Sequence, residues 1–173
     1  MFLNIKDMEF RKVRFDETFE PGVIDFLDVD IRQVGPLHAE GSAEMLENTG
    51  GQVRVTGRYS VMMEAECDRC LAPARCSLNE TVDLFYQPAS QAAEAAEEDE
   101  IDEGAVEIAF YEGLGMELAD VLKEQILLAL PMQRVCKTEC KGICATCGAN
   151  RNESDCQCYL KPAEDRWKAL KNL

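Results

Sequence analysis

The spacing of the cysteines limits the fold of this 173-residue chain more than any other feature of its sequence. Six of the nine cysteines lie between Cys136 and Cys158, and an earlier pair has the spacing Cys67-x2-Cys70. Zinc in structural sites takes four ligands in a tetrahedron, and a Cys-x2-Cys turn supplies two of them. The chain must then fold so that sulfur atoms from separate segments meet. The cysteine pattern therefore predicts metal-binding modules.

The eight candidate ligands divide into two sets of four, and Cys76 is left over. The C-terminal set begins with the turn Cys144-Ala145-Thr146-Cys147-Gly148, where Gly148 can adopt the positive φ that lets backbone N–H groups point at thiolates. We expect this set to contain Cys144, Cys147, Cys156 and Cys158. The other set contains Cys67, Cys70, Cys136 and Cys140, and it requires the strand that contains Cys67 to lie near the end of the helix that we expect at residues 116–130.

Other arrangements of the cysteines stay open at this point. Cys140 can replace Cys158 in the C-terminal set. Alternatively, one helical face can carry Cys136, Cys140 and Cys144, although Gly142 makes that helix poor. Iron in a four-thiolate site has the same geometry as zinc, and we expect zinc, as one ion or two. Because four thiolates close the coordination shell while catalytic zinc keeps an open position, we expect the metal to be structural.

The net charge of -15 is unevenly distributed along the chain. Residues 1–88 carry 9 Lys and Arg against 16 Asp and Glu, residues 89–133 carry 1 against 12, and residues 134–173 carry 8 against 5. Residues 89–104 contain no Lys, Arg or aromatic residue, and we expect them to form an acidic, mobile connector. Such a chain is not expected to coat nucleic acid non-specifically, because that binding needs Lys and Arg to neutralise phosphates.

Neither a secretory signal pattern nor an apolar run of the about 18 residues that cross a bilayer occurs in the sequence. We therefore expect a cytoplasmic protein that does not bind a membrane. In a reducing compartment, many cysteines indicate metal or redox chemistry rather than a disulfide framework.

Alternating polar and apolar residues predict a β-rich first half. Val53, Val55, Val61 and Met63 alternate with polar residues, which is typical of a half-buried strand. The turn signal Gly50-Gly51 makes residues 37–46 the expected hairpin partner. Further strands are expected at residues 13–15, 77–86 and 105–111. Together these segments predict an antiparallel sheet that is partly barrel-like.

The clearest helical pattern covers residues 116–130. Leu118, Val121, Leu122 and Ile126 share one face, and Pro131 ends the helix. We expect this one main helix to pack on the sheet, which gives an α+β fold with a C-terminal cysteine-rich zinc-binding module. The expected segments are a β-rich part at 1–88, the connector at 89–104, a strand and the helix at 105–133, and the zinc module with a basic tail at 134–173.

Several motifs resemble a known family in the same order along the chain. They are Cys67-Asp68-Arg69-Cys70-Leu71, Leu127-Leu128-Ala129-Leu130-Pro131, Cys140-Lys141-Gly142-Ile143-Cys144-Ala145-Thr146-Cys147-Gly148-Ala149-Asn150 and Asp165-Arg166-Trp167-Lys168-Ala169-Leu170. They resemble the YceD-like family of large ribosomal RNA subunit accumulation proteins. Two departures are Ala145, where the family often has proline, and Ala163-Glu164, which interrupts the terminal motif.

This resemblance implies a bacterial cytosolic protein, or an organelle descendant of one, that is needed for normal accumulation of 23S ribosomal RNA. It also implies a non-enzymatic role in biogenesis of the large ribosomal subunit. The expected partner is ribosomal RNA or a ribosomal protein of that subunit, and no small-molecule substrate is expected.

Basic and aromatic side chains supply the candidate contacts to RNA or to a protein partner. Arginine pairs with phosphate through its planar fork and stacks on bases, and a tryptophan ring offers a further stacking surface. The candidates on or beside the sheet and around the metal are Arg54, Arg58, Arg69, Arg75, Arg134, Lys137, Lys141, Arg151 and Trp167.

Alternative functions use other features of the sequence. Cys67 and Cys70 can act as a thiol redox switch if the Arg69 cation lowers a thiol pKa, although such motifs usually lie at a helix start. The acidic residues 94–103 can recruit a basic ribosomal protein, because charge complementarity speeds encounter. His38 is the only histidine, so any Ser-His-Asp hydrolase depends on it, and we expect no enzyme.

Overall fold

The computed structural model describes residues 1–26, 30–90 and 108–160. The chain forms two compact units, of which the first combines Met1–Ala65 with Arg75–Met132 and the second combines Glu66–Ala74 with Gln133–Leu173. The first unit contains the sheets and the two described α-helices, and the second contains eight of the nine cysteines. Most of the expected acidic connector, and Trp167, lie outside the described residues.

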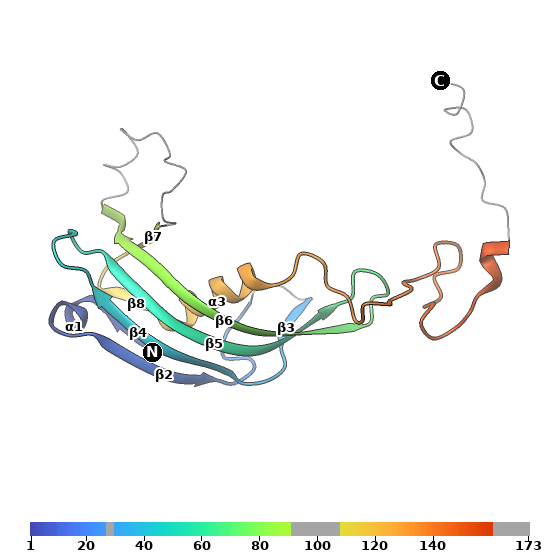
Figure 1. Ribbon diagram of the computed structural model, residues 1–173, viewed down its shortest axis with the longest axis horizontal. Coiled ribbons are helices and arrows are strands. Elements are labelled where there is room, and N and C mark those ends of the chain that lie inside the picture. The colour runs from blue at the N-terminus through green and yellow to red at the C-terminus, as the bar shows by residue number, and fades with distance from the viewer. Residues whose placement is uncertain (27–29, 91–107, 161–173) are drawn as a thin grey trace, which may run out of the picture. The chain divides into compact units, whose positions relative to one another are not determined.

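A six-stranded sheet forms the main part of the first unit (Figure 1). Its strand order is β2-β4-β5-β6-β7, and β3 pairs with β5 beyond the end of β4. The bounds are β2 Val13–Phe19, β3 Ile31–Gln33, β4 Leu37–Met45, β5 Val53–Glu66, β6 Pro73–Pro88 and β7 Ile108–Tyr111. The expected α+β class is therefore found, and the pairs among β2, β3, β4 and β5 are antiparallel as expected.

Strand β7 pairs with β6 in parallel, which differs from the fully antiparallel sheet that we expected. A parallel pair needs a long connection, and 19 residues separate Pro88 from Ile108. The sheet is open, because β2 and β7 stand at the two ends of its strand order. The partly barrel-like closure is thus not confirmed.

Two helices, rather than one main helix, occur in the described residues of the first unit. The short helix α1, Ile5–Phe10, begins after Asn4, whose side chain accepts a hydrogen bond from Lys6 N at 2.9 Å. Strands β1, Phe2–Asn4, and β8, Gly115–Glu117, form a second, two-stranded sheet. The longer helix α3, Leu118–Ala129, follows β8 directly. Neither helix is long and apolar enough to cross a membrane.

The core of the first unit lies between the main sheet and α3. The alternating residues of β5 are buried, and the apolar stripe of α3 is buried in the same cluster. The Tyr59 hydroxyl donates to Gln125 O of α3 at 3.2 Å, and burial raises the pKa of Tyr59 to about 12. Tyr59 therefore remains a donor at any physiological pH.

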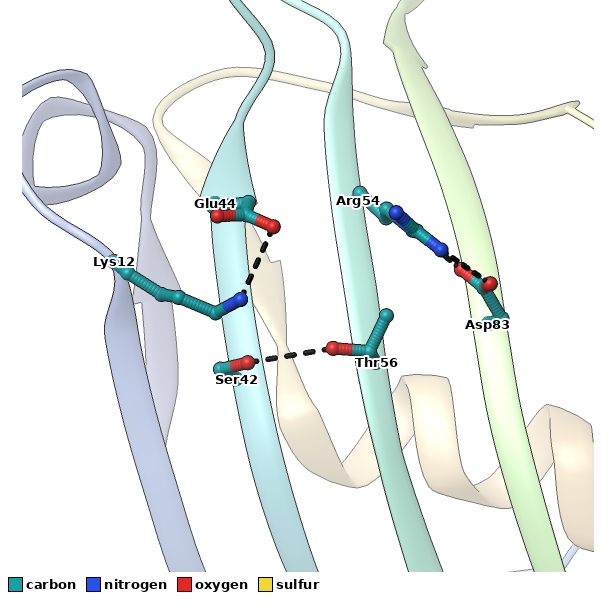
Figure 2. Close-up of polar contacts among 6 residues, drawn as sticks. All are labelled: Lys12, Ser42, Glu44, Arg54, Thr56 and Asp83. Atoms are coloured by element: carbon teal, nitrogen blue, oxygen red, sulfur yellow. Dashed lines mark hydrogen bonds and ion pairs between the residues drawn. The ribbon is translucent and has the colours of Figure 1, made fainter.

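The other face of the sheet is polar. Figure 2 shows Lys12, Glu44, Ser42 and Arg54 on the side of the sheet that faces away from α3. Lys12 Nζ lies 3.1 Å from Glu44 Oε1, and the Ser42 and Thr56 hydroxyls lie 3.3 Å apart. This division follows from the alternation of side chains along each strand.

Two glycines let β4 and β5 approach closely near the middle of the sheet. Gly41 is the register partner of Gly57, and the Phe15 ring covers the same position. A Cβ atom on Gly41 would lie 2.2 Å from Thr56 O and 2.7 Å from Cζ of Phe15. Any larger residue at position 41 must therefore displace backbone.

We expect Gly41→Ala to lower the free energy of unfolding by about 1–3 kcal/mol, the usual cost of overpacking. The matched control is Gly35→Ala, because a Cβ there would meet only Met62 Cβ at 3.6 Å. Urea denaturation of both variants measures the difference. Equal stability of Gly41→Ala and Gly35→Ala would contradict this account of the sheet.

Candidate metal centres

The turn between β5 and β6 presents the first two sulfur atoms. Cys67 N donates to Ala72 O at 2.9 Å, and Leu71 N donates to Cys67 O at 2.9 Å. Leu71 has a φ of 61°, a conformation that residues other than glycine adopt rarely. The side chains of Cys67 and Cys70, at the start and in the middle of this closed turn, are both buried.

Asp68 attaches a distant segment to this turn. Its backbone N–H donates to Arg134 O at 2.8 Å, and its Oδ2 atom accepts from Arg134 N at 2.6 Å. These bonds bring the segment that carries Cys136 and Cys140 to the turn. Sequence reasoning did not single out Asp68, and its only signal was its position inside the Cys-x2-Cys motif.

The sulfur atoms of Cys67, Cys70, Cys136 and Cys140 form what we term the hairpin group. All four lie within 4.8 Å of one another. The Cys67 and Cys140 sulfurs are 3.8 Å apart, and the Cys70 and Cys136 sulfurs are 3.6 Å apart. A tetrahedron with Zn–S bonds of about 2.3 Å has edges of about 3.8 Å, whereas a disulfide needs about 2.05 Å. The spacing fits a four-thiolate metal site and not two disulfides.

The remaining four sulfurs form the tail group, which comprises Cys144, Cys147, Cys156 and Cys158 and also lies within 4.8 Å. Gly148 has a φ of 74°, and its N–H donates to Cys144 O at 2.8 Å, closing the first turn. The 3₁₀-helix η1, Gln157–Leu160, carries the last of these sulfurs.

The structure thus brings the eight sequence-predicted ligands together as four plus four. Residues 136–144 form no helix, so the arrangement with three cysteines on one helical face is wrong. Cys76 lies in β6, packed against the core of the first unit. Both groups can hold a metal ion, and zinc as that ion stays a prediction.

Each group contains thiols of opposite acidity. Burial raises the pKa of Cys67, but backbone N–H groups of Cys136, Arg69 and Cys70 outweigh it and lower the pKa to about 6. Backbone N–H groups of Cys147 and Thr146 likewise lower the pKa of Cys144 to about 6. The neighbouring N–H groups therefore favour the thiolate form of Cys67 and Cys144.

Two other thiols hold their protons. Burial and hydrogen bonds with neighbouring sulfurs raise the pKa of Cys136 to about 12. A hydrogen bond with Cys147, followed by burial, raises the pKa of Cys158 to about 12. A cation that binds all four sulfurs must displace these protons, so metal binding is coupled to proton release.

Two classes include seven of the eight candidate RNA contacts in the described residues, and Arg69 belongs to neither. Carboxylates partner the basic side chains of the first class: Arg54 with Asp83 at 2.7 Å, Arg58 with Glu40, Arg75 with Glu64 at 2.9 Å, and Arg134 with Asp68 at 3.6 Å. Arg69 Nη1 donates to Cys140 O at 3.3 Å. The second class is exposed and has no side-chain partner among the described residues: Lys137, Lys141 and Arg151.

An α+β sheet unit joined to a unit with two four-cysteine groups defines the class of this protein. The chain belongs to the YceD family, because the model described as "Large ribosomal RNA subunit accumulation protein YceD" matches residues 55–173. That match includes both cysteine groups.

Relatives in two bacteria are similar to parts of the chain. The uncharacterized protein Rv2926c of Mycobacterium tuberculosis is 32% identical over 104 residues, which cover 60% of this chain and 47% of the relative. The chain thus spans about half the length of this relative. The uncharacterized protein YlbN of Bacillus subtilis is 28% identical over 139 residues, covering 78% of this chain and 72% of the relative. No solved structure matches the chain.

We expect the purified chain to contain two zinc atoms, as measured by elemental analysis against protein concentration. Cys67→Ser and Cys144→Ser should each retain one, because each removes a ligand from a different group. Cys76→Ser is the matched control and should retain two, since its sulfur belongs to neither group. Loss of zinc in Cys76→Ser, or no loss in the other two, would contradict this assignment.

Zinc affinity should fall as the pH is lowered from 8 to 6. Protons compete for the thiolates, and the raised pKa values of Cys136 and Cys158 mean that these protons bind tightly in the metal-free chain. Competition with a chromophoric chelator at each pH measures the effect. An affinity that does not change over this range would show that the ligands are not thiols.

Proposed function

We propose that this chain is a non-enzymatic, zinc-containing cytoplasmic factor that supports 23S ribosomal RNA accumulation and large ribosomal subunit biogenesis. It acts by binding ribosomal RNA or a ribosomal protein of the large subunit. The description of its family supports the connection to the large ribosomal subunit. The observation that carries the proposal is the pair of four-sulfur groups, since each has enough ligands to close a zinc shell.

A closed shell argues for a structural role of the metal. Catalytic zinc needs a position for water or substrate, and a fourth protein thiolate occupies that position. The metal ions then fix the positions of the side chains around the sulfurs, and the second unit is a binding module rather than a reaction centre.

The surroundings of His38 also argue against an enzyme. His38 lies on the exposed face of β4, where its Nδ1 atom is 3.4 Å from the Thr18 hydroxyl and 3.8 Å from Asp16. Ser60 is its register partner on β5, but the described hydrogen bonds of His38 do not include the Ser60 hydroxyl. The Thr18 hydroxyl is the one possible nucleophile in contact with this ring among the described hydrogen bonds, and 3.4 Å at an exposed imidazole is longer than the about 2.6–3.2 Å at which a base activates a hydroxyl.

We assign the contact surface to the second unit, on the basis of charge. The sheet arginines Arg54 and Arg58 are neutralised by carboxylates, whereas Lys137, Lys141 and Arg151 have no such partner among the described residues. An unpaired cation can neutralise a phosphate without first breaking an ion pair, so it contributes more to RNA binding. The same cations can contact an acidic segment of a ribosomal protein.

The redox switch is the alternative function, and the low pKa of Cys67 favours it. A switch requires Cys67 and Cys70 to form a reversible disulfide in a metal-free protein. However, Cys67 and Cys70 do not stand apart as a pair, because their sulfurs also lie 3.8 Å from Cys140 and 3.6 Å from Cys136, respectively, in one group of four. A metal-free chain that cycles between dithiol and disulfide would favour the switch, and a chain that retains zinc would exclude it.

We expect the triple variant Lys137→Ala, Lys141→Ala and Arg151→Ala to bind 23S ribosomal RNA transcripts more weakly. The slope of log affinity against log salt should decrease in magnitude by about 2–3, since each lost phosphate contact contributes about 0.7–0.9. Filter binding at several salt concentrations measures both quantities. Arg54→Ala is the control, because this cation is already paired with Asp83.

An unchanged salt slope in the triple variant would remove these positions from the RNA contact. The partner would then be a protein, which binding assays with purified large-subunit proteins can identify. A wild-type chain that binds neither the transcripts nor any of these proteins would contradict the proposed function.

A further inference from the structure

One side chain of the tail loop, defined as residues 148–155, reaches the hairpin group. The Asn152 amide Nδ2 donates to the Cys140 sulfur at 3.3 Å. Its Oδ1 atom accepts a hydrogen bond from Lys141 N at 3.0 Å. Both ends of the Asn152 side chain thus bind the last turn of the hairpin group, although the residue lies between Cys147 and Cys156 of the tail group.

Asn150 fixes the orientation of this side chain. The Asn150 Oδ1 atom accepts from the Asn152 N–H at 3.0 Å and from Asn152 Nδ2 at 2.9 Å. The Asn150 carbonyl accepts from Glu153 N at 3.1 Å and from Ser154 N at 3.0 Å. Asparagine suits such turns, because its amide bonds to the backbone two residues further on.

Backbone pairing connects the tail loop to the same turn. Arg151 N donates to Gly142 O at 2.9 Å, and Ile143 forms a β-bridge with Asn150. Ile143 N in turn donates to Arg69 O in the Cys67 turn at 2.9 Å. The two cysteine groups are therefore linked by a continuous set of hydrogen bonds within the second unit.

The tail loop has no apolar core of its own. None of residues 148–155 is buried, so hydrophobic packing contributes little to its order. Its ends are the tail ligands Cys147 and Cys156. Bonds from one metal ion to both ends would remove most of the loop's conformational freedom.

We propose that Asn152 is a positioning residue that couples the two metal sites: an ion in the tail group orders the tail loop and thereby holds the Asn152 amide against the Cys140 sulfur. This inference rests on the proposed binding of zinc by both groups. An N–H donor stabilises a metal-bound thiolate, and the loss of such an outer partner typically costs about 10–100-fold in metal affinity. Because coupling is reciprocal, zinc in the hairpin group must raise the affinity of the tail group by the same factor.

The test compares zinc affinities of single groups with those in the full set of ligands. Cys144→Ser with Cys147→Ser leaves only the hairpin group, and Cys67→Ser with Cys70→Ser leaves only the tail group. Zinc competition with a chromophoric chelator should show each isolated group binding about 10-fold more weakly than it does in the wild-type chain. If each isolated group binds zinc as tightly as it does in the wild-type chain, the two sites are not coupled. This comparison needs no substitution at Asn152.

Substitutions at Asn152 then test its role directly. Asn152→Ala should reduce the hairpin affinity to that of the hairpin-only variant and should cause no further loss when combined with it. Asn152→Asp should weaken the hairpin group more than Asn152→Ala, because a carboxylate oxygen would face the Cys140 sulfur. Ser154→Ala is the control, since its hydroxyl reaches only Asn150 O, at 3.4 Å.

Two further results decide the interpretation. In the tail-only background, Asn152→Ala should leave zinc affinity unchanged, which shows that the tail loop still forms its own site. Unchanged hairpin affinity in Asn152→Ala would overturn the role of Asn152. Two zinc ions that bind independently would contradict only the coupling, whereas a chain that binds no zinc would contradict the proposed function as well.

Discussion

The convergence of four sulfurs at each of two points is the constraint on which the second unit depends. Among the described residues, its buried apolar cluster consists of Cys67, Cys70, Ala74 and Cys140, with the partly buried Ala72, Val135 and Cys136 packed against it. So small a core cannot offset the conformational entropy of the segments that meet there, because most folding free energy in ordinary domains comes from apolar burial. Metal–thiolate bonds can supply the missing free energy, as they do in small zinc domains.

The first unit obtains its stability in the ordinary way, from apolar residues that alternate along β5 and from the stripe on α3. Its two longest strands, β5 and β6, end on either side of the turn that carries Cys67 and Cys70. The hydrogen bonds from Cys67 N to Ala72 O and from Leu71 N to Cys67 O close this turn and limit the positions that its two sulfurs can adopt. Despite burial, backbone N–H groups of the turn and of Cys136 lower the pKa of Cys67, so the local backbone of the second unit sets the chemistry of this ligand.

Local patterns in the sequence predicted much of the fold. The alternation in β5, the Gly50-Gly51 turn and the α3 stripe each depend on neighbouring residues, and all three were predicted. The parallel pairing of β7 and the small β1–β8 sheet depend on contacts between distant segments, which periodicity does not report. The same limit applies to the candidate site. Cys-x2-Cys spacing identified the ligands, whereas Asp68 and Asn152 act through contacts 66 and 12 residues away.

The ion pair between Arg54 and Asp83 could not be predicted from the sequence either, since these residues are 29 positions apart on different strands.

We propose that thiolates alone surround each metal ion and close its coordination shell. X-ray absorption spectroscopy of the zinc-loaded chain tests this claim most directly. We predict a first shell of four sulfurs at about 2.3 Å. A shell that contains nitrogen or oxygen, or fewer than four sulfurs per zinc, would contradict the account.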